Sequence, residues 1–100
     1  MLELPLQPLP RQSFEVTLGG RQWAIRIIQV SPDQMAIDVI IDLQPVVLGV
    51  RCTPGAPVLQ YDHLRVQFGD LAWEGVPWWS YFGTPACSLL WASPGELGYV

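Results

Sequence analysis

The sequence predicts an all-β fold, a small antiparallel barrel or sandwich that begins with a three-stranded meander. Apolar and polar residues alternate along several short segments, as they do along half-buried strands. Ten prolines and nine glycines are spread through the 100 residues and separate these segments. No segment longer than about ten residues carries helical periodicity. Short alternating segments with frequent turn residues are typical of β sandwiches and barrels.

The first element is a predicted hairpin. Residues 13–18 alternate without a fault, and residues 21–30 are again rich in β-forming side chains. Gly19-Gly20 between them is a favoured two-residue turn, because glycine takes positive φ at both positions. Turn length and side-chain chemistry agree on one register. On one face this register makes three cross-strand pairs, the last two of them apolar on both sides: Leu18 with Arg21, Val16 with Trp23, and Phe14 with Ile25.

A third strand is expected from Met35 to Asp42, after a turn at residues 31–34 that has proline where a type I turn favours it. Asp38 and Asp42 point to one face of this strand, where we expect solvated edge carboxylates. The apolar residues of the other face lie opposite those of the preceding strand only if the loop between the strands has three or five residues. The matched sets are Ile37, Val39 and Ile41 against Trp23, Ile25 and Ile27.

The remaining elements are shorter. A fourth strand is expected over residues 46–52, where Gly49 indicates a bulge or a close approach of the backbone. A loop over residues 53–57 and a short strand over residues 63–68 follow. After Gly69-Asp70 the chain turns again, and a last strand is expected near residues 88–91.

We expect one all-β structural domain over residues 1–100. Residues 1–12 form a proline-rich N-terminal arm, which lacks the basic region of a secretory signal peptide. Residues 75–95 form an uncharged, tryptophan-rich segment that is long enough to span a bilayer. Its prolines would leave backbone groups unsatisfied in lipid, so no membrane span is expected. The segment is instead expected to be buried or partner-facing β and loop structure.

Charged residues are scarce. They make up 14% of the chain, against about 25% in an average soluble protein. Lysine is absent, and the five positive residues are all arginine, which is favoured at protein interfaces where lysine is depleted. This bias indicates burial against partner proteins. The net charge of −4 and the absence of a basic cluster argue against specific nucleic-acid binding.

The residues that could support catalysis or hold a metal form no recognisable motif. His63 is the single histidine, and a triad with Cys87 and a nearby acid such as Asp62 or Asp70 lacks any signature. Cys52 and Cys87 lack the spacing of metal ligands, and whether they pair or stay buried free thiols is left open. We therefore expect no enzymatic activity, no cofactor and no metal.

Five tryptophans are the compositional anomaly, and three interpretations stay open: core, protein interface and sugar-binding platform. If the backbone at Trp78-Trp79 is extended, neighbouring side chains alternate, and one of the two should face something other than the core. The candidates for a partner interface are the aromatic residues of the last third and two arginines: Trp78, Trp79, Tyr81, Phe82, Trp91, Arg51 and Arg65.

Three features together resemble the phage baseplate plug protein family. They are the opening Leu4-Pro5-Leu6, the strand–turn–strand pattern of residues 12–23, and residues 45–50 with the Pro-Gly loop and the Gly69-Asp70-Leu71 element behind them. The resemblance covers roughly residues 2–72 and does not extend to the tryptophan-rich residues 73–91.

The resemblance implies a structural virion component of a contractile phage tail, assembled in the host cytoplasm. It implies an all-β protein that packs as a plug against the central baseplate hub and neighbouring subunits, in several symmetric copies, with no catalytic residues. The alternative is a carbohydrate-binding module of a tail-tip protein, in which Trp78, Trp79 and Tyr81 stack on sugar rings.

Overall fold

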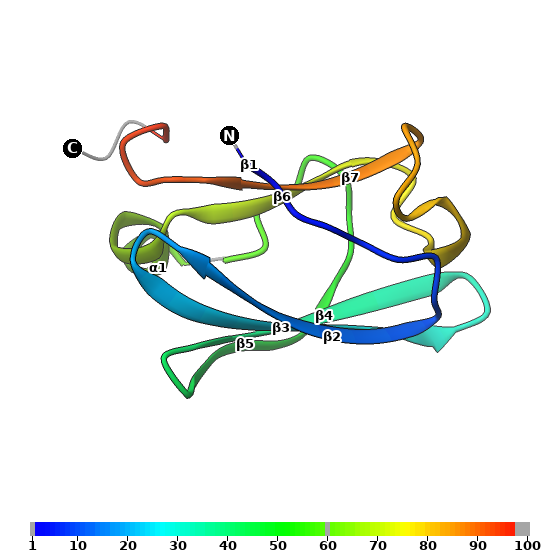
Figure 1. Cartoon of the computed structure of the whole chain (residues 1–100), viewed down its shortest axis with the longest axis horizontal. Coiled ribbons are helices and arrows are strands. Elements are labelled where there is room, and N and C mark those ends of the chain that lie inside the picture. Colours follow the sequence, from blue (N-terminus) through cyan, green and yellow to red (C-terminus); the bar gives the residue numbers. More distant parts are fainter. Residues whose placement is uncertain (1, 60, 98–100) are drawn as a thin grey trace.

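Two antiparallel sheets face each other across the core in the computed structural model, which describes residues 2–59 and 61–97 (Figure 1). The four-stranded sheet has the order β2-β3-β4-β5, made of Arg11–Leu18, Arg21–Ser31, Gln34–Ile41 and Gln44–Arg51. The three-stranded sheet has the order β1-β7-β6, made of Leu2–Glu3, Cys87–Ala92 and Asp70–Gly75. Helix α1 (Asp62–Phe68) and the short 3-10 helix η1 (Trp79–Tyr81) lie toward opposite ends of the sandwich. The predicted all-β class is confirmed, as a sandwich rather than a closed barrel.

The predicted first hairpin is confirmed in register. Leu18 pairs with Arg21, and the apolar pairs Val16–Trp23 and Phe14–Ile25 follow. Gly19 and Gly20 have φ of 59° and 77°, which is the type I′ geometry that fits the twist of the two strands.

The predicted match between β3 and β4 is also confirmed, with Trp23 opposite Ile41 and Ile25 opposite Val39. The connection between Gln29 and Met35, which pair with each other, has an odd number of residues, as required, but only because of a bulge. The turn places Ser31 opposite Gln34, and a register shift between Gln29 and Ser31 adds the extra residue. A bulge of this kind inserts one residue into one strand and restores the side-chain faces beyond it.

Gly49 lies in the predicted bulge of β5. Ile37 pairs with Val50 and Val39 with Val47, so two residues of β5 lie opposite Asp38. Gly49 has a φ of 68°, which a residue with a side chain rarely adopts.

The bulge overturns the expectation that Asp38 is solvated. The residue is 6% exposed, and its Oδ1 accepts a hydrogen bond of 2.6 Å from the N–H of Gly49. Its Oδ2 accepts from Nε of Arg26 at 2.9 Å and from Nη2 of the same side chain. The irregular backbone of β5 therefore turns a surface carboxylate into a buried acceptor. Asp42 lies on the exposed turn after β4, as expected of a solvated carboxylate.

The predicted strand over residues 63–68 is wrong, because this segment forms helix α1. Its polar and apolar residues alternate, which is the pattern of a half-buried strand. In the helix, Leu64 and Phe68 lie one turn apart and pack against the core, while Val66 is 50% exposed. The alternation of this short segment was thus compatible with two structures.

The core between the sheets buries two of the five tryptophans completely or almost completely. Trp23 from the four-stranded sheet and Trp73 from the three-stranded sheet are 0% and 2% exposed. Full burial of a large apolar side chain contributes roughly 1.5–3 kcal/mol relative to leaving it in water. The two cysteines lie in this core as free thiols. Burial, together with the neighbouring Cys87, raises the pKa of Cys52 to about 12, and burial also raises the pKa of Cys87.

Asp70 ties the loop before α1 to the outer edge of β6. Its Oδ1 accepts hydrogen bonds of 2.8 Å from the N–H groups of Leu59 and Leu71. The N–H of Val58 also donates to the carbonyl of Leu71, at 3.3 Å. Burial raises the pKa of Asp70, although these hydrogen bonds and Arg65 oppose the shift.

Asp38→Asn is expected to lower the free energy of unfolding by about 1.5–3 kcal/mol, because the buried carboxylate accepts charge-assisted hydrogen bonds. The matched control is Asp42→Asn, which changes the same group in the exposed pair with Arg21 and should cost less than about 1 kcal/mol. Denaturant unfolding of both variants measures the difference. Equal losses would contradict the structural role of Asp38.

Asp70→Asn is expected to change the pH dependence of stability. Because the folded-state pKa of Asp70 is raised, the folded protein holds this proton more tightly than the unfolded chain. The contribution is most favourable below the ordinary value of 3.8 and is lost as pH rises through the folded-state pKa. The variant keeps an oxygen acceptor and cannot ionise. Its free energy of unfolding should therefore rise relative to wild type as pH increases, and parallel pH curves would contradict this.

Candidate functional site

The connection from β6 to β7, residues 76–86, carries the uncharged aromatic residues that the sequence singled out. Its anchor is Phe82, which is 1% exposed and stacks on Trp73 with ring centroids 5.5 Å apart and an interplanar angle of 20°. Phe82 thus lies inside the core, where its ring is not available to a partner. The residues just before it are held at the surface by this contact.

Backbone hydrogen bonds give the connection a defined shape. The N–H of Val76 donates to the carbonyl of Ala86 at 3.0 Å and closes the loop at its base. Within the loop, the N–H of Tyr81 donates to Trp78 at 3.0 Å, and Oγ1 of Thr84 donates to the carbonyl of Tyr81 at 2.6 Å. Such local pairing favours a preformed surface over one that has to be ordered on binding.

Trp78 and Trp79 do not alternate as neighbours on a strand would. Trp78 is extended, but Trp79 begins η1, so the extended backbone on which that expectation depended ends between them. Both rings are half-buried and pack against the core, with centroids 6.4 Å apart and planes inclined by 41°. Each tryptophan therefore shows part of its ring to the solvent.

Four side chains of this loop form what we call the aromatic patch: Val76, Trp78, Trp79 and Tyr81. Val76 and Tyr81 are 52% and 44% exposed. The sequence has no charged residue from Gly75 to Gly95, so the patch lies in an uncharged stretch of the chain. Exposed aromatic side chains with little charge near them are typical of the energetically dominant residues of protein interfaces.

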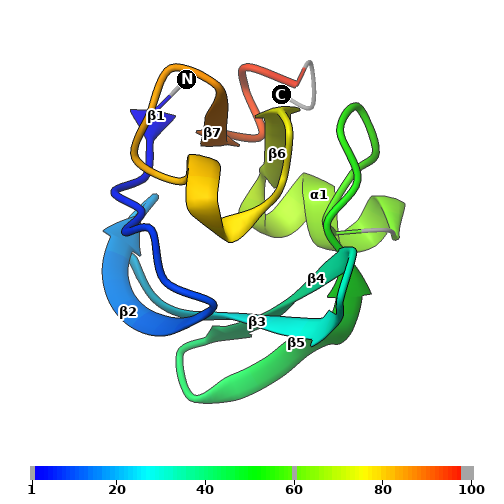
Figure 2. The same cartoon turned by 90° about the vertical axis from the view of Figure 1, so that its right-hand side faces the viewer.

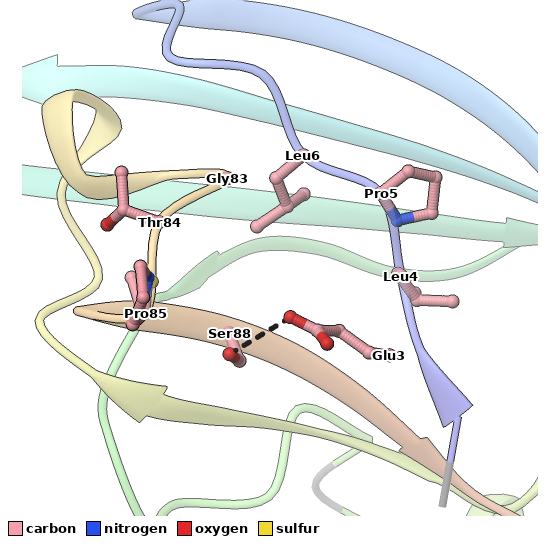
Figure 3. Close-up of a pocket in the computed structure, with 9 residues that line it drawn as sticks. Glu3, Leu4, Pro5, Leu6, Gly83, Thr84, Pro85 and Ser88 are labelled. Carbon is pink, nitrogen blue, oxygen red and sulfur yellow. Dashed lines mark hydrogen bonds between the residues drawn. The ribbon is translucent and has the colours of Figure 1, made fainter.

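A cleft of about 670 Å³ adjoins the chain just after the patch (Figure 3). One wall is the N-terminal arm, residues 3–6, and the other is residues 83–85 with Cys87 and Ser88. Oγ of Ser88 donates to Oε1 of Glu3 at 3.2 Å. The two walls touch near Gly83, where an added Cβ would lie 2.9 Å from the carbonyl oxygen of Leu6. The arm therefore helps to form the surface beside the patch.

The other predicted interface residues are not part of this patch. Nε1 of Trp91 donates to the carbonyl of Phe68 at 3.2 Å, which ties β7 to the end of α1. Nη1 of Arg65 donates to the carbonyl of Leu59 at 2.9 Å, so this guanidinium holds the loop before its own helix. Arg51 is exposed at the end of β5, in the other sheet. Of the candidates, Trp78, Trp79 and Tyr81 share one loop, in which the rings of Trp78 and Trp79 contact each other.

Among the exposed apolar residues that the sequence interpretation did not single out, Val76 and Leu43 stand at defined turns or loops. Val76 belongs to the aromatic patch, and Leu43 is 91% exposed on the turn after β4. Asp42 and Leu43 have φ of 51° and 66°, a geometry that favours glycine or asparagine. The exposure of Leu43 could have been predicted from the sequence, because this apolar residue stands between two polar residues at a turn that follows a strand.

The described residues do not assemble the groups of the hydrolytic triad. His63 is exposed on α1 and stacks on Tyr61 with ring centroids 5.9 Å apart, whereas Cys87 is buried in β7. Within residues 2–59 and 61–97, no group of three or more His, Cys, Asp and Glu side chains could hold a metal ion. A search of the same residues finds no helix with the length and apolar character needed to cross a membrane.

The fold and this surface define a class of protein: a small β sandwich whose uncharged aromatic patch suits packing against other proteins. Residues 1–94 match the family model described as cyanophage baseplate Pam3 plug gp18, so the chain belongs to this family of phage baseplate plug proteins. The predicted resemblance is confirmed and extends beyond residue 72 to include the aromatic patch. Membership supports a structural role in a phage tail baseplate, together with other baseplate components. No curated protein matches the chain.

Both thiols are expected to be unreactive in the folded protein, because the reactive species is the thiolate and burial raises both pKa values. At pH about 8, their reaction with a disulfide reagent should be at least about a hundredfold slower than in the denatured chain. Cys52→Ser and Cys87→Ser, measured separately, assign the rate to each residue. A thiol that reacts equally fast in both states would contradict its burial.

Proposed function

We propose that this chain is a non-enzymatic structural plug of a contractile phage-tail baseplate, which packs against the central hub through the aromatic patch. Assembly would take place in the host cytoplasm, with several symmetric copies in the virion. Family membership supports the baseplate role. The observation that carries the choice of surface is the partial exposure of Trp78, Trp79 and Tyr81 on one preformed, uncharged loop.

The exposed parts of the aromatic rings are unfavourable in water, so covering them with a partner lowers the free energy. Burial of apolar surface contributes roughly 25 cal/mol per Å², and a rigid loop loses little conformational entropy when it binds. The adjoining cleft between the N-terminal arm and residues 83–88 offers a concave surface for a protruding side chain of the partner. A hub subunit that covers both features would remove the aromatic patch from water.

A carbohydrate-binding module is the second candidate function, and the geometry of the rings favours it less. The planes of Trp78 and Trp79 are inclined by 41°, and both rings are packed partly against the core. A sugar platform would offer open ring faces with polar side chains around them. Here the sequence from Gly75 to Gly95 has no charged and no amide side chain, and its polar side chains are hydroxyls and the Cys87 thiol.

Tyr81→Ala is expected to weaken binding to the baseplate hub protein of the same phage about tenfold or more, as the loss of an aromatic hot spot does. The matched control is Tyr61→Ala, which removes another exposed tyrosine on the chain segment next to α1. Calorimetry or interferometry with purified hub gives both affinities. If the two variants bind the hub with equal affinity, the hub does not contact the aromatic patch through Tyr81. Glycan-array binding that is lost in Tyr81→Ala would favour the carbohydrate-binding function.

A further inference from the structure

The free edges of the two sheets differ in how they are protected. An exposed strand edge is a template for another strand, and proteins usually blunt it. The edge of β5 contains Pro45 and two register shifts, and the outer edge of β6 is covered by residues 58–59. β1 is only two residues long. β2 lies at the other edge of the four-stranded sheet (Figure 2). It differs from these edges, because its eight residues pair with β3 without a register shift.

The hydrogen bonds show which backbone groups of β2 face outward. The N–H of Gln29 donates to the carbonyl of Pro10 at 2.9 Å, and this pair is in register with the rest of the β2–β3 ladder. In an antiparallel pair, hydrogen-bonded and non-hydrogen-bonded positions alternate. The even-numbered residues of β2 therefore bond to β3. The N–H and C=O groups that point away belong to the odd-numbered residues: Arg11, Ser13, Glu15 and Thr17.

These outward-facing groups have no backbone partner among the described residues. Their side chains are exposed on the outer face of the sheet. On the inner side of the same edge, Phe14 and Val16 are only half-buried, although they pack against the core. The edge of β2 thus offers unpaired backbone groups next to incompletely covered apolar side chains.

We propose that this edge binds a second copy of the chain, by antiparallel pairing of the two β2 strands about a two-fold axis at Ser13. The charges on the strand select this register. It places Arg11 opposite Glu15 of the second copy, twice, whereas an axis at Arg11 or at Glu15 would place like charges opposite each other. Directly opposite charges stabilise a strand pair and like charges destabilise it.

The same register satisfies the backbone. Pairing about Ser13 sets odd-numbered residues opposite odd-numbered residues, so the outward-facing N–H and C=O groups of one copy meet those of the other. Within one strand, Arg11 and Glu15 are four residues apart, about 13 Å, which is too far for a direct ion pair. In the dimer, Arg11 of each copy can instead form an ion pair with Glu15 of the other copy.

The apolar side of the edge is covered in the same dimer. Phe14 lies opposite Gln12 of the second copy and diagonal to its Phe14, a distance that aromatic side chains span. Such a contact uses one surface patch on both copies, as two-fold symmetry requires. The two four-stranded sheets then form one continuous sheet. This interface does not use the aromatic patch, so the dimer and the hub contact can be tested separately.

Light scattering and sedimentation of the isolated chain over micromolar concentrations test the proposal, and we expect a dimer. Glu15→Arg and Arg11→Glu each place like charges opposite one another and should raise the dimer dissociation constant about tenfold or more. The double variant Arg11→Glu/Glu15→Arg restores opposite charges and should restore the dimer. Glu74→Arg makes the same charge change on β6 and should leave the dimer intact.

Ser13→Pro provides a test that does not depend on charge. It removes an N–H that points away from β3, so the fold should persist by circular dichroism while the dimer is lost. A chain that is monomeric throughout the concentration range would overturn the proposal. So would a dimer that survives Ser13→Pro, or single charge variants that the double variant fails to rescue. A wild-type chain that forms the dimer but does not bind the hub protein would count against the proposed function only.

Discussion

The stacking of Phe82 on Trp73 is the contact on which the position of the aromatic patch depends. It joins the loop between β6 and β7 to the centre of the core, with both rings almost fully buried. Because the loop is fixed at this point, the residues before Phe82 have a limited choice of positions. Trp78 and Trp79 lie along the margin of the core, and Tyr81 extends into the solvent. The loop thus serves as core and as surface within a few residues.

The few charged residues of the chain serve the backbone at two important positions. Asp38 accepts from the bulge of β5, and Asp70 accepts from the loop that covers the edge of β6. Buried carboxylates of this kind are stable only when hydrogen bonds compensate the loss of solvation. Two of the nine acidic residues, Asp38 and Asp70, therefore stabilise irregular parts of the backbone. Fewer charges remain for the exterior, which suits a protein that other subunits cover.

Membership in the plug family and the distribution of surface features are consistent with each other. The aromatic patch and the cleft involve the connection from β6 to β7 and the N-terminal arm, whereas the free edge of β2 belongs to the other sheet. A small protein with separate contact surfaces can join several neighbours in one assembly.

The sequence by itself determined the three-stranded meander and its register, because turn length and side-chain alternation are local properties of the chain. At Gly49 it left a bulge and a close approach of the backbone as alternatives, and the structure shows the bulge. Local pattern also predicted the last strand and an uncharged aromatic loop. Only the tertiary structure decided that residues 62–68 form a helix, since their alternation fits either structure until Leu64 and Phe68 meet the core. It likewise decided that Phe82 is buried, that Asp38 is covered, and that β1 pairs with β7. Each of these depends on contacts between segments far apart in sequence, whose energies no local pattern contains.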